Sequence, residues 1–172
     1  MKKIGLSIVA IFCLTFILSG CGSKVSSGKY DIYKVKITKV STNDSGEWVI
    51  KGKTKAPNGA KLVALNKDDR SFKDENAAQS DDLNWSKVEN GNFETYVDGS
   101  TLTDKVKAGT TINVNIFAIT NYHKERENSI PNNVIKAYEQ NFKSTKLTIS
   151  SSQSKYLKSV DRDSKNLEQL LP

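Results

Sequence analysis

The residues with the clearest chemical meaning lie at the end of an apolar N-terminal segment. The segment opens with two lysines, continues with the apolar run 4–18 and closes with Leu18, Ser19, Gly20 and Cys21. A charged start, an apolar middle and small residues at the end are the layout of a secretory signal peptide. We therefore expect residues 1–20 to be removed and the rest of the chain to work outside the cytoplasm. An uncleaved membrane anchor is the alternative, because the run is about long enough to span a bilayer.

The sequence Leu18-Ser19-Gly20-Cys21 resembles the lipobox of bacterial lipoproteins of the Gram-positive type. The resemblance implies that Cys21 receives a diacylglycerol, with fatty acids such as palmitate, through a thioether. It also implies that signal peptidase II recognises Leu18, Ser19 and Gly20 and cuts before Cys21. Two acyl chains are the number needed for stable attachment to a membrane. The resemblance therefore predicts a lipid-anchored protein that faces outward from the cell membrane.

The mature chain offers few residue types that could perform catalysis. Cys13 leaves with the signal peptide and Cys21 carries the lipid, so no cysteine remains for a disulfide, a nucleophile or a metal. His123 is the only histidine, and no Gly-x-Ser-x-Gly sequence accompanies it. The acidic stretch 68–82 lacks the ligand spacing of a calcium loop and the context of a glycosidase carboxylate pair. We expect a non-catalytic protein that binds no metal and no cofactor. Its one attached group would be the covalent lipid.

The charge of the chain indicates anionic partners. The net charge of +7 falls to about +5 when Lys2 and Lys3 are removed with the signal peptide. A basic domain outside the cytoplasm is attracted to anionic lipid headgroups and to anionic wall polymers. The alternative is that the charge serves only solubility. Nucleic acid is not an expected partner outside the cell.

Alternating apolar and polar residues predict a series of short strands. Turn sequences rich in Gly, Asn, Asp and Pro separate the strands, and 131–141 has the spacing of a short helix or wide loop. Short strands at regular spacing predict an all-β antiparallel sandwich. The expected strands cover residues 30–40, 47–55, 61–66, 93–97, 111–121 and 143–150.

The predicted organisation has four parts. Residues 1–20 form the signal peptide, and residues 21–29 form the lipidated cysteine and a flexible tether rich in Gly, Ser and Lys. Residues 30–150 form the sandwich domain. Residues 151–172 form a weakly amphipathic C-terminal helix or a disordered tail.

Three stretches of turn and core residues resemble bacterial immunoglobulin-like domains of surface proteins. They are Gly52-Lys53-Thr54 with the turn and strand that follow, the sequence Asn90-Gly91-Asn92-Phe93 leading to Val97, and Ala108-Gly109-Thr110 before the strand 112–118. The resemblance implies an Ig-like fold. It implies no particular activity, because such folds carry many functions.

Aromatic residues on or near long loops are the candidate binding residues. Trp85, Tyr96, Phe117 and Tyr122 could include an exposed ledge, with Trp85, Tyr96 and Tyr122 as the candidate binding residues, and core or edge packing is the favoured alternative for most of them. A recognition surface would lie on the loops 67–84 and 121–132. We expect a binding module that contacts an anionic wall polymer or an envelope protein. The alternatives are an accessory subunit of an envelope transport, secretion or conjugation machine, a solute-binding or enzymatic lipoprotein, and a precursor of a signal-peptide-derived pheromone. The pheromone reading is based on residues 13–20, which are similar to such peptides in length, hydrophobicity and their Leu-Ser-Gly end.

Overall fold

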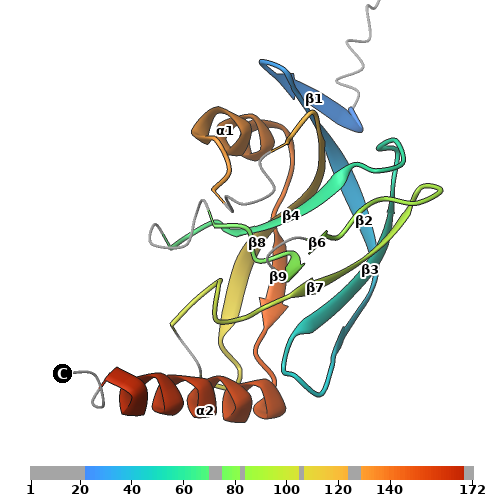
Figure 1. The fold of residues 1–172 in the computed structure, drawn as a ribbon. Coiled ribbons are helices and arrows are strands. Elements are labelled where there is room, and N and C mark those ends of the chain that lie inside the picture. Colours follow the sequence, from blue (N-terminus) through green and yellow to red (C-terminus); the bar gives the residue numbers. More distant parts are fainter. Residues whose placement is uncertain (1–21, 70–74, 82–83, 105–106, 124–128, 169–172) are drawn as a thin grey trace, which may run out of the picture.

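The computed structural model describes residues 22–69, 75–81, 84–104, 107–123 and 129–168. Antiparallel strands are the main elements of this part of the chain, which also contains two α-helices (Figure 1). In chain order the elements are β1 (Lys24–Ser27), β2 (Tyr30–Thr42), β3 (Trp48–Thr54), β4 (Lys61–Asn66), β5 (Gln79–Asp81), β6 (Asn84–Trp85), β7 (Asn92–Val97), β8 (Thr111–Thr120), α1 (Asn132–Asn141), β9 (Thr145–Thr148) and α2 (Ser151–Glu168).

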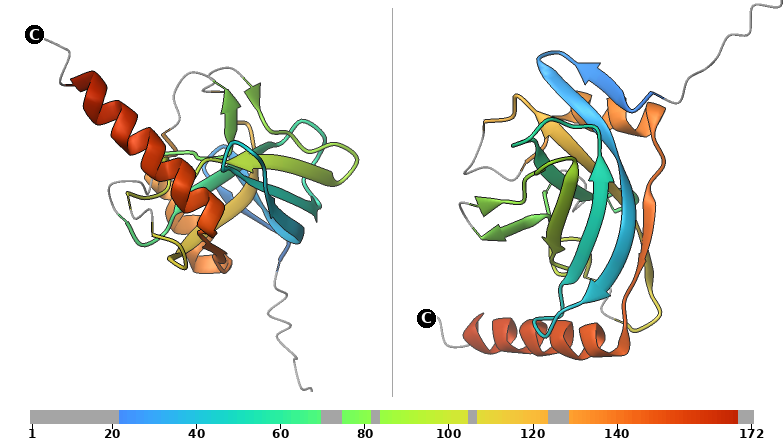
Figure 2. Two further views of the ribbon diagram at one scale, coloured as in Figure 1. Left: turned by 90° about the horizontal axis from the view of Figure 1, so that it is seen from below. Right: turned by 90° about the vertical axis from the view of Figure 1, so that its right-hand side faces the viewer.

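The long strand β2 holds the sheet together. The strand order is β4-β8-β2-β3-β7, with β1 added to β2 and β9 added to β8. The first part of β2, residues 31–34, pairs with β8, whereas residues 35–42 pair with β3. A β-bulge between Ile37 and Lys39 increases the bend of β2, as bulges do. The sheet therefore curls around its inner face (Figure 2).

The segment between β4 and β7 joins the two ends of the curled sheet. The Ala77 amide donates to the Ala64 carbonyl of β4 at 2.8 Å, and the Ala77 carbonyl accepts from the Asp98 amide just after β7 at 3.2 Å. Earlier along the same edge of β4, the Leu62 amide donates to the Ser86 carbonyl at 2.8 Å. These bonds satisfy backbone groups that would otherwise be unpaired at a sheet edge.

Strands β4 and β8 are buried on both faces, which explains why their sequences read as continuous apolar runs. Side chains at alternate positions, such as Leu62, Val114 and Ile116, enter the core inside the curl. The intervening side chains, such as Val63 and Phe117, enter a second core on the outer side.

Helix α1 covers the second core. Val134, Ile135 and Tyr138 are its buried residues, and the Tyr138 ring stacks on Phe117 with centroids 4.9 Å apart. The Tyr138 hydroxyl donates to the Lys143 carbonyl at 2.9 Å. Burial raises the pKa of Tyr138 to about 12, so the hydroxyl remains a donor at neutral pH.

Helix α2 lies across the opposite end of the curled sheet from β1 (Figures 1 and 2). Ser150 and Gln153 form a capping box. The backbone N–H of Gln153 donates to Ser150 Oγ, and the backbone N–H of Ser150 donates to Gln153 Oε1. The buried Gln153 side chain also donates to the Gly46 carbonyl in the β2–β3 turn. Leu157, 3 % exposed, enters the inner core. The helix is thus fixed to the sheet through its first two turns.

The structure confirms the all-β class, with a curled antiparallel sheet and two short helices, whereas the Ig-like sandwich stays a prediction. The flexible tether expected at 21–29 is wrong for its described part. Residues Lys24–Ser27 are instead strand β1, paired with β2, and Ser27 Oγ donates to the Asn133 carbonyl of α1. Serine and lysine are readily accommodated on a half-exposed strand, so composition did not reveal the pairing. The C-terminal region is helical from Ser151 to Glu168.

The contact between α2 and the β2–β3 turn gives a stability prediction. Gly46 has φ +74°, and a Cβ at this position would lie 2.6 Å from the Tyr156 ring. We expect Gly46→Ala to lower the free energy of unfolding by about 2 kcal/mol or more, from backbone strain and displacement of Tyr156.

Gly59→Ala is the matched control, because Gly59 has φ +83° and nothing lies within 4 Å of its Cβ position. Strain alone should cost about 1 kcal/mol there. Urea denaturation of both variants measures the difference. Equal losses would show that α2 does not press on Gly46.

Candidate functional site

Lysines dominate the outward side of β2 and β3. Side chains alternate along a strand, and the inward positions of these strands, such as Ile50 and Val35, contribute to the inner core. The outward positions carry exposed lysines in close succession: Lys34, Lys36 and Lys39 on β2, Lys51 and Lys53 on β3, and Lys55 just after β3. The pattern therefore collects positive charge on one surface.

One pair of these lysines has a geometry that costs stability. Lys36 and Lys53 are directly opposite each other on the antiparallel strands β2 and β3. Cβ atoms of such partners are about 5 Å apart, and like charges in this position destabilise a sheet. The arrangement disfavours folding, and a bound anion would offset the repulsion.

The same lysines border a cavity of about 280 Å³, here called the basic groove. Its lining contains four lysines, and among the described residues that line it none is acidic. The groove begins at Ser23, whose carbonyl accepts from the Lys34 amide at 2.9 Å. The lining residues are Ser23, Lys34, Val35, Lys36, Lys53, Thr54 and Lys55.

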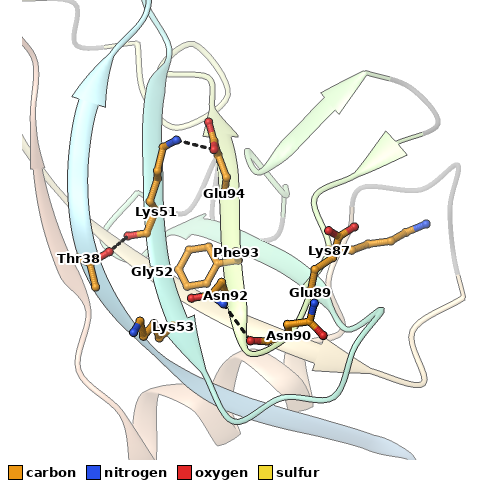
Figure 3. Close-up of a pocket in the computed structure, with 10 residues that line it drawn as sticks. All are labelled: Thr38, Lys51, Gly52, Lys53, Lys87, Glu89, Asn90, Asn92, Phe93 and Glu94. Atoms are coloured by element: carbon orange, nitrogen blue, oxygen red, sulfur yellow. Dashed lines mark hydrogen bonds and ion pairs between the residues drawn. The ribbon is translucent and has the colours of Figure 1, made fainter.

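A larger and more mixed cavity of about 680 Å³, here called the polar trough, lies next to the groove and shares Lys53 with it (Figure 3). Gly52 and Phe93 lie between the polar side chains that surround it. Amide and hydroxyl groups accompany the charges, which suits a ligand with several hydroxyl groups. The lining residues are Thr38, Lys51, Gly52, Lys53, Lys87, Glu89, Asn90, Asn92, Phe93 and Glu94.

An ion pair within the trough neutralises one of its lysines. Lys51 Nζ lies 2.6 Å from Glu94 Oε2 (Figure 3). The hydrogen bond between them raises the pKa of Lys51 and lowers the pKa of Glu94, so both groups are charged at neutral pH. Lys51 also has a lysine, Lys39, as its cross-strand partner. Glu94 therefore acts as a built-in counter-ion at this pair, whereas the basic groove contains no acidic residue among its described lining.

The structure separates the three aromatic candidates. Trp85 and Tyr122 are 4 % and 3 % exposed, and their rings pack 5.2 Å apart in the outer core. Their expected place in an exposed ledge is therefore wrong, because the second core that α1 covers needs large rings to fill it. Tyr96 is half-buried on β7, and its hydroxyl donates at 3.3 Å to Oε1 of Glu94, a residue that lines the trough.

Other candidate positions are only partly described. Asp68, in the acidic stretch, accepts a hydrogen bond from Asn113 Nδ2 at 2.5 Å. In the described part of the chain no group of three His, Cys, Asp or Glu side chains could hold a metal ion. Neither of the two described helices has the length and apolar character needed to cross a membrane. Cys21 and the residues Leu18, Ser19 and Gly20 lie outside the described residues.

Sequence reasoning missed the lysines of the outer face, although their spacing carried the signal. Lys34 and Lys36 alternate on one strand, and Lys51, Lys53 and Lys55 alternate on the next. Their assembly on one surface depends on the register that places Lys36 opposite Lys53.

Comparison with known proteins finds no matching family model, no matching curated protein and no matching solved structure. The site is therefore interpreted from its own geometry and charge.

The opposed lysines predict an unusual stability change. Lys36→Glu replaces a repulsive cross-strand pair with an attractive one, and we expect the free energy of unfolding to rise by about 0.5 kcal/mol. Glu94→Gln removes the counter-ion of Lys51 and leaves the Lys39–Lys51 pair uncompensated, so stability should fall by a similar amount. Urea midpoints of the two variants give the comparison. A loss of stability in Lys36→Glu would contradict the proposed repulsion.

Proposed function

We propose that the chain is a lipid-anchored protein on the outer side of the cell membrane, whose β domain binds an extended anionic polymer of the envelope without catalysis. The observation that carries the proposal is the lysine surface on β2 and β3, where Lys36 and Lys53 are opposed. A polyanion would relieve that repulsion and turn an unfavourable feature of the fold into binding energy. The Ig-like sandwich belongs to this proposal as the scaffold that presents the surface.

The polar trough fits such a polymer better than it fits a compact ligand. It extends over β2, β3, β7 and the residues before β7, and its lining is polar throughout most of its length (Figure 3). Lys53 and Lys87 would contact phosphates or carboxylates of the polymer. The hydroxyl of Thr38 and the amide side chains of Asn90 and Asn92 would contact its sugar or polyol hydroxyls.

The lipid anchor is the second part of the proposal. Cys21 would carry the diacylglycerol after cleavage behind Leu18, Ser19 and Gly20, as the lipobox resemblance implies. The anchor would hold the domain at the membrane, where a polymer of the envelope is present at high local concentration.

One observation favours a second function, that of an accessory subunit in an envelope machine. Tyr156 and Val160 on α2 are 39 % and 37 % exposed, and their i, i+4 spacing places them on one face of the helix. A protein partner that packs against α2 would cover them.

Polymer binding can be tested with charge reversals in the trough. We expect Lys53→Glu combined with Lys87→Glu to lower the binding of the mature protein to isolated cell walls at least tenfold, because two cationic contacts become repulsive. Co-sedimentation over a salt series measures the binding, and walls stripped of anionic polymers provide the reference.

The control variant carries Lys146→Glu and Lys158→Glu, two exposed lysines on β9 and α2 that line neither cavity. It has the same net charge as the trough variant. If both variants lose binding equally, net charge alone accounts for it and the trough is not the site. If the wild-type protein does not bind intact walls at low salt, the polymer proposal fails.

The anchor has its own test. Cys21→Ala should leave an unprocessed precursor that incorporates no labelled fatty acid, because the thiol that accepts the lipid is absent. The wild-type chain, labelled in parallel, should yield a shorter, labelled product. Incorporation of lipid by Cys21→Ala would refute the assignment of Cys21.

A further inference from the structure

We propose that the basic groove is the membrane-facing surface of the domain, that its lysines contact the phosphates of anionic lipids, and that the domain is thereby held with α2 directed away from the bilayer. The inference rests on the proposed lipid anchor at Cys21 and adds a second partner, the bilayer itself, to the polymer proposed for the trough. Four observations support it: the short link between Cys21 and β1, the pairing of that link with β2, the positive charge of the groove, and the position of α2.

The link between the anchor and the fold is too short to let the domain move freely. Only Gly22 and Ser23 separate Cys21 from Lys24, where β1 begins. Consecutive Cα atoms are about 3.8 Å apart, so the Cα of Ser23 lies at most about 8 Å from that of Cys21. A diacylglycerol on Cys21 would therefore keep Ser23 at the level of the lipid headgroups.

Ser23 is itself part of the groove. Its carbonyl accepts from the Lys34 amide at 2.9 Å, and strand β1 continues the pairing with β2 from Lys24 to Ser27. The anchor is thus attached to a paired strand. The side of the fold that carries Lys34 and Lys36 must lie close to the bilayer whenever the lipid is inserted.

The charge of this surface suits anionic headgroups. Attraction between lysines and a charged membrane decays within a Debye length, about 8 Å at physiological salt, so only residues close to the anchor can benefit. The groove presents four lysines, and among its described lining residues none is acidic. The nearby Asp31 on β2 is neutralised by Lys24, whose Nζ lies 2.8 Å from Asp31 Oδ2. The surface beside the anchor is therefore cationic.

The orientation has a structural consequence at the other end of the molecule. Helix α2 crosses the end of the curled sheet opposite β1 (Figures 1 and 2). With the groove on the bilayer, the exposed Tyr156 and Val160 of α2 would face away from the membrane, where an envelope partner can reach them.

The first experiment measures the lipid contact without the anchor. The mature chain with Cys21→Ser would be mixed with vesicles of phosphatidylcholine, with and without phosphatidylglycerol, and its binding measured by flotation. Each lysine near an anionic surface contributes roughly fivefold in affinity, so Lys36→Glu with Lys55→Glu should weaken binding to the phosphatidylglycerol vesicles by about 30-fold or more. The control variants Lys146→Glu with Lys158→Glu should bind more tightly than this double variant.

The groove variant has a built-in check on folding. Lys36→Glu, one of its two changes, is expected to raise stability, so a loss of vesicle binding without a lower urea midpoint is a loss of the contact. Equal binding to vesicles with and without phosphatidylglycerol, or equal binding by the wild-type and groove variants, would overturn the inference.

The second experiment measures orientation in the lipidated protein. A fluorophore would be placed on Pro57→Cys, in the exposed turn after Lys55, or on Lys158→Cys in α2, using vesicles with a quencher in the lipid headgroup. The mature chain offers no other free thiol once Cys21 is lipidated. We expect quenching at position 57 several times that at position 158, and we expect the groove variant to reduce it. Equal quenching at both positions would overturn the orientation.

These outcomes are separable from those of the proposed function. Failure to incorporate fatty acid at Cys21 would remove the anchor. Intact lipidation with equal quenching would remove only the orientation. The single variant Lys87→Glu changes a residue that lines only the trough. If it loses wall binding and keeps vesicle binding, the trough and the groove serve different partners.

Discussion

The structure depends on burying both faces of β4 and β8. An antiparallel sheet usually leaves one face to solvent, but here side chains such as Leu62 and Val114 fill the inside of the curl, whereas Val63 and Phe117 fill the space beneath α1. Only a curled sheet with a covering helix satisfies both requirements. The bend of β2 allows the curl, since one strand pairs with β8 over its first part and with β3 over its second.

Among the described elements, no helix covers the outer side of β3 and of the second part of β2, and there the chain places its lysines. Their arrangement opposes stability at Lys36 and Lys53, whereas Glu94 offsets the neighbouring pair of Lys39 and Lys51. One lysine pair on this sheet therefore has a carboxylate counter-ion, whereas the described residues that line the groove beside the other pair include none. Proximity of the uncompensated pair to Ser23 connects this chemistry to the proposed anchor.

The two helices have different parts in the molecule. Helix α1 completes a core, and its aromatic residue Tyr138 is held by stacking and by a hydrogen bond to the chain after the helix. Helix α2 is fixed at its first turns by the Ser150–Gln153 capping box and by the bond from Gln153 to the Gly46 carbonyl. Tyr156 and Val160 on α2 are exposed, whereas Val134, Ile135 and Tyr138 on α1 are buried.

The sequence by itself determined the β character of the chain, because period-two alternation and Gly/Asn turns specify strands locally; the strand 61–66 was predicted at its observed bounds. The lipobox stays a prediction from resemblance, based on four consecutive residues. Only the tertiary structure decided that Lys24–Ser27 pairs with β2, that Trp85 and Tyr122 are interior, and that Lys36 faces Lys53. Strand pairing, burial and register depend on residues far apart in the chain, and a local sequence pattern does not specify which distant residues these are.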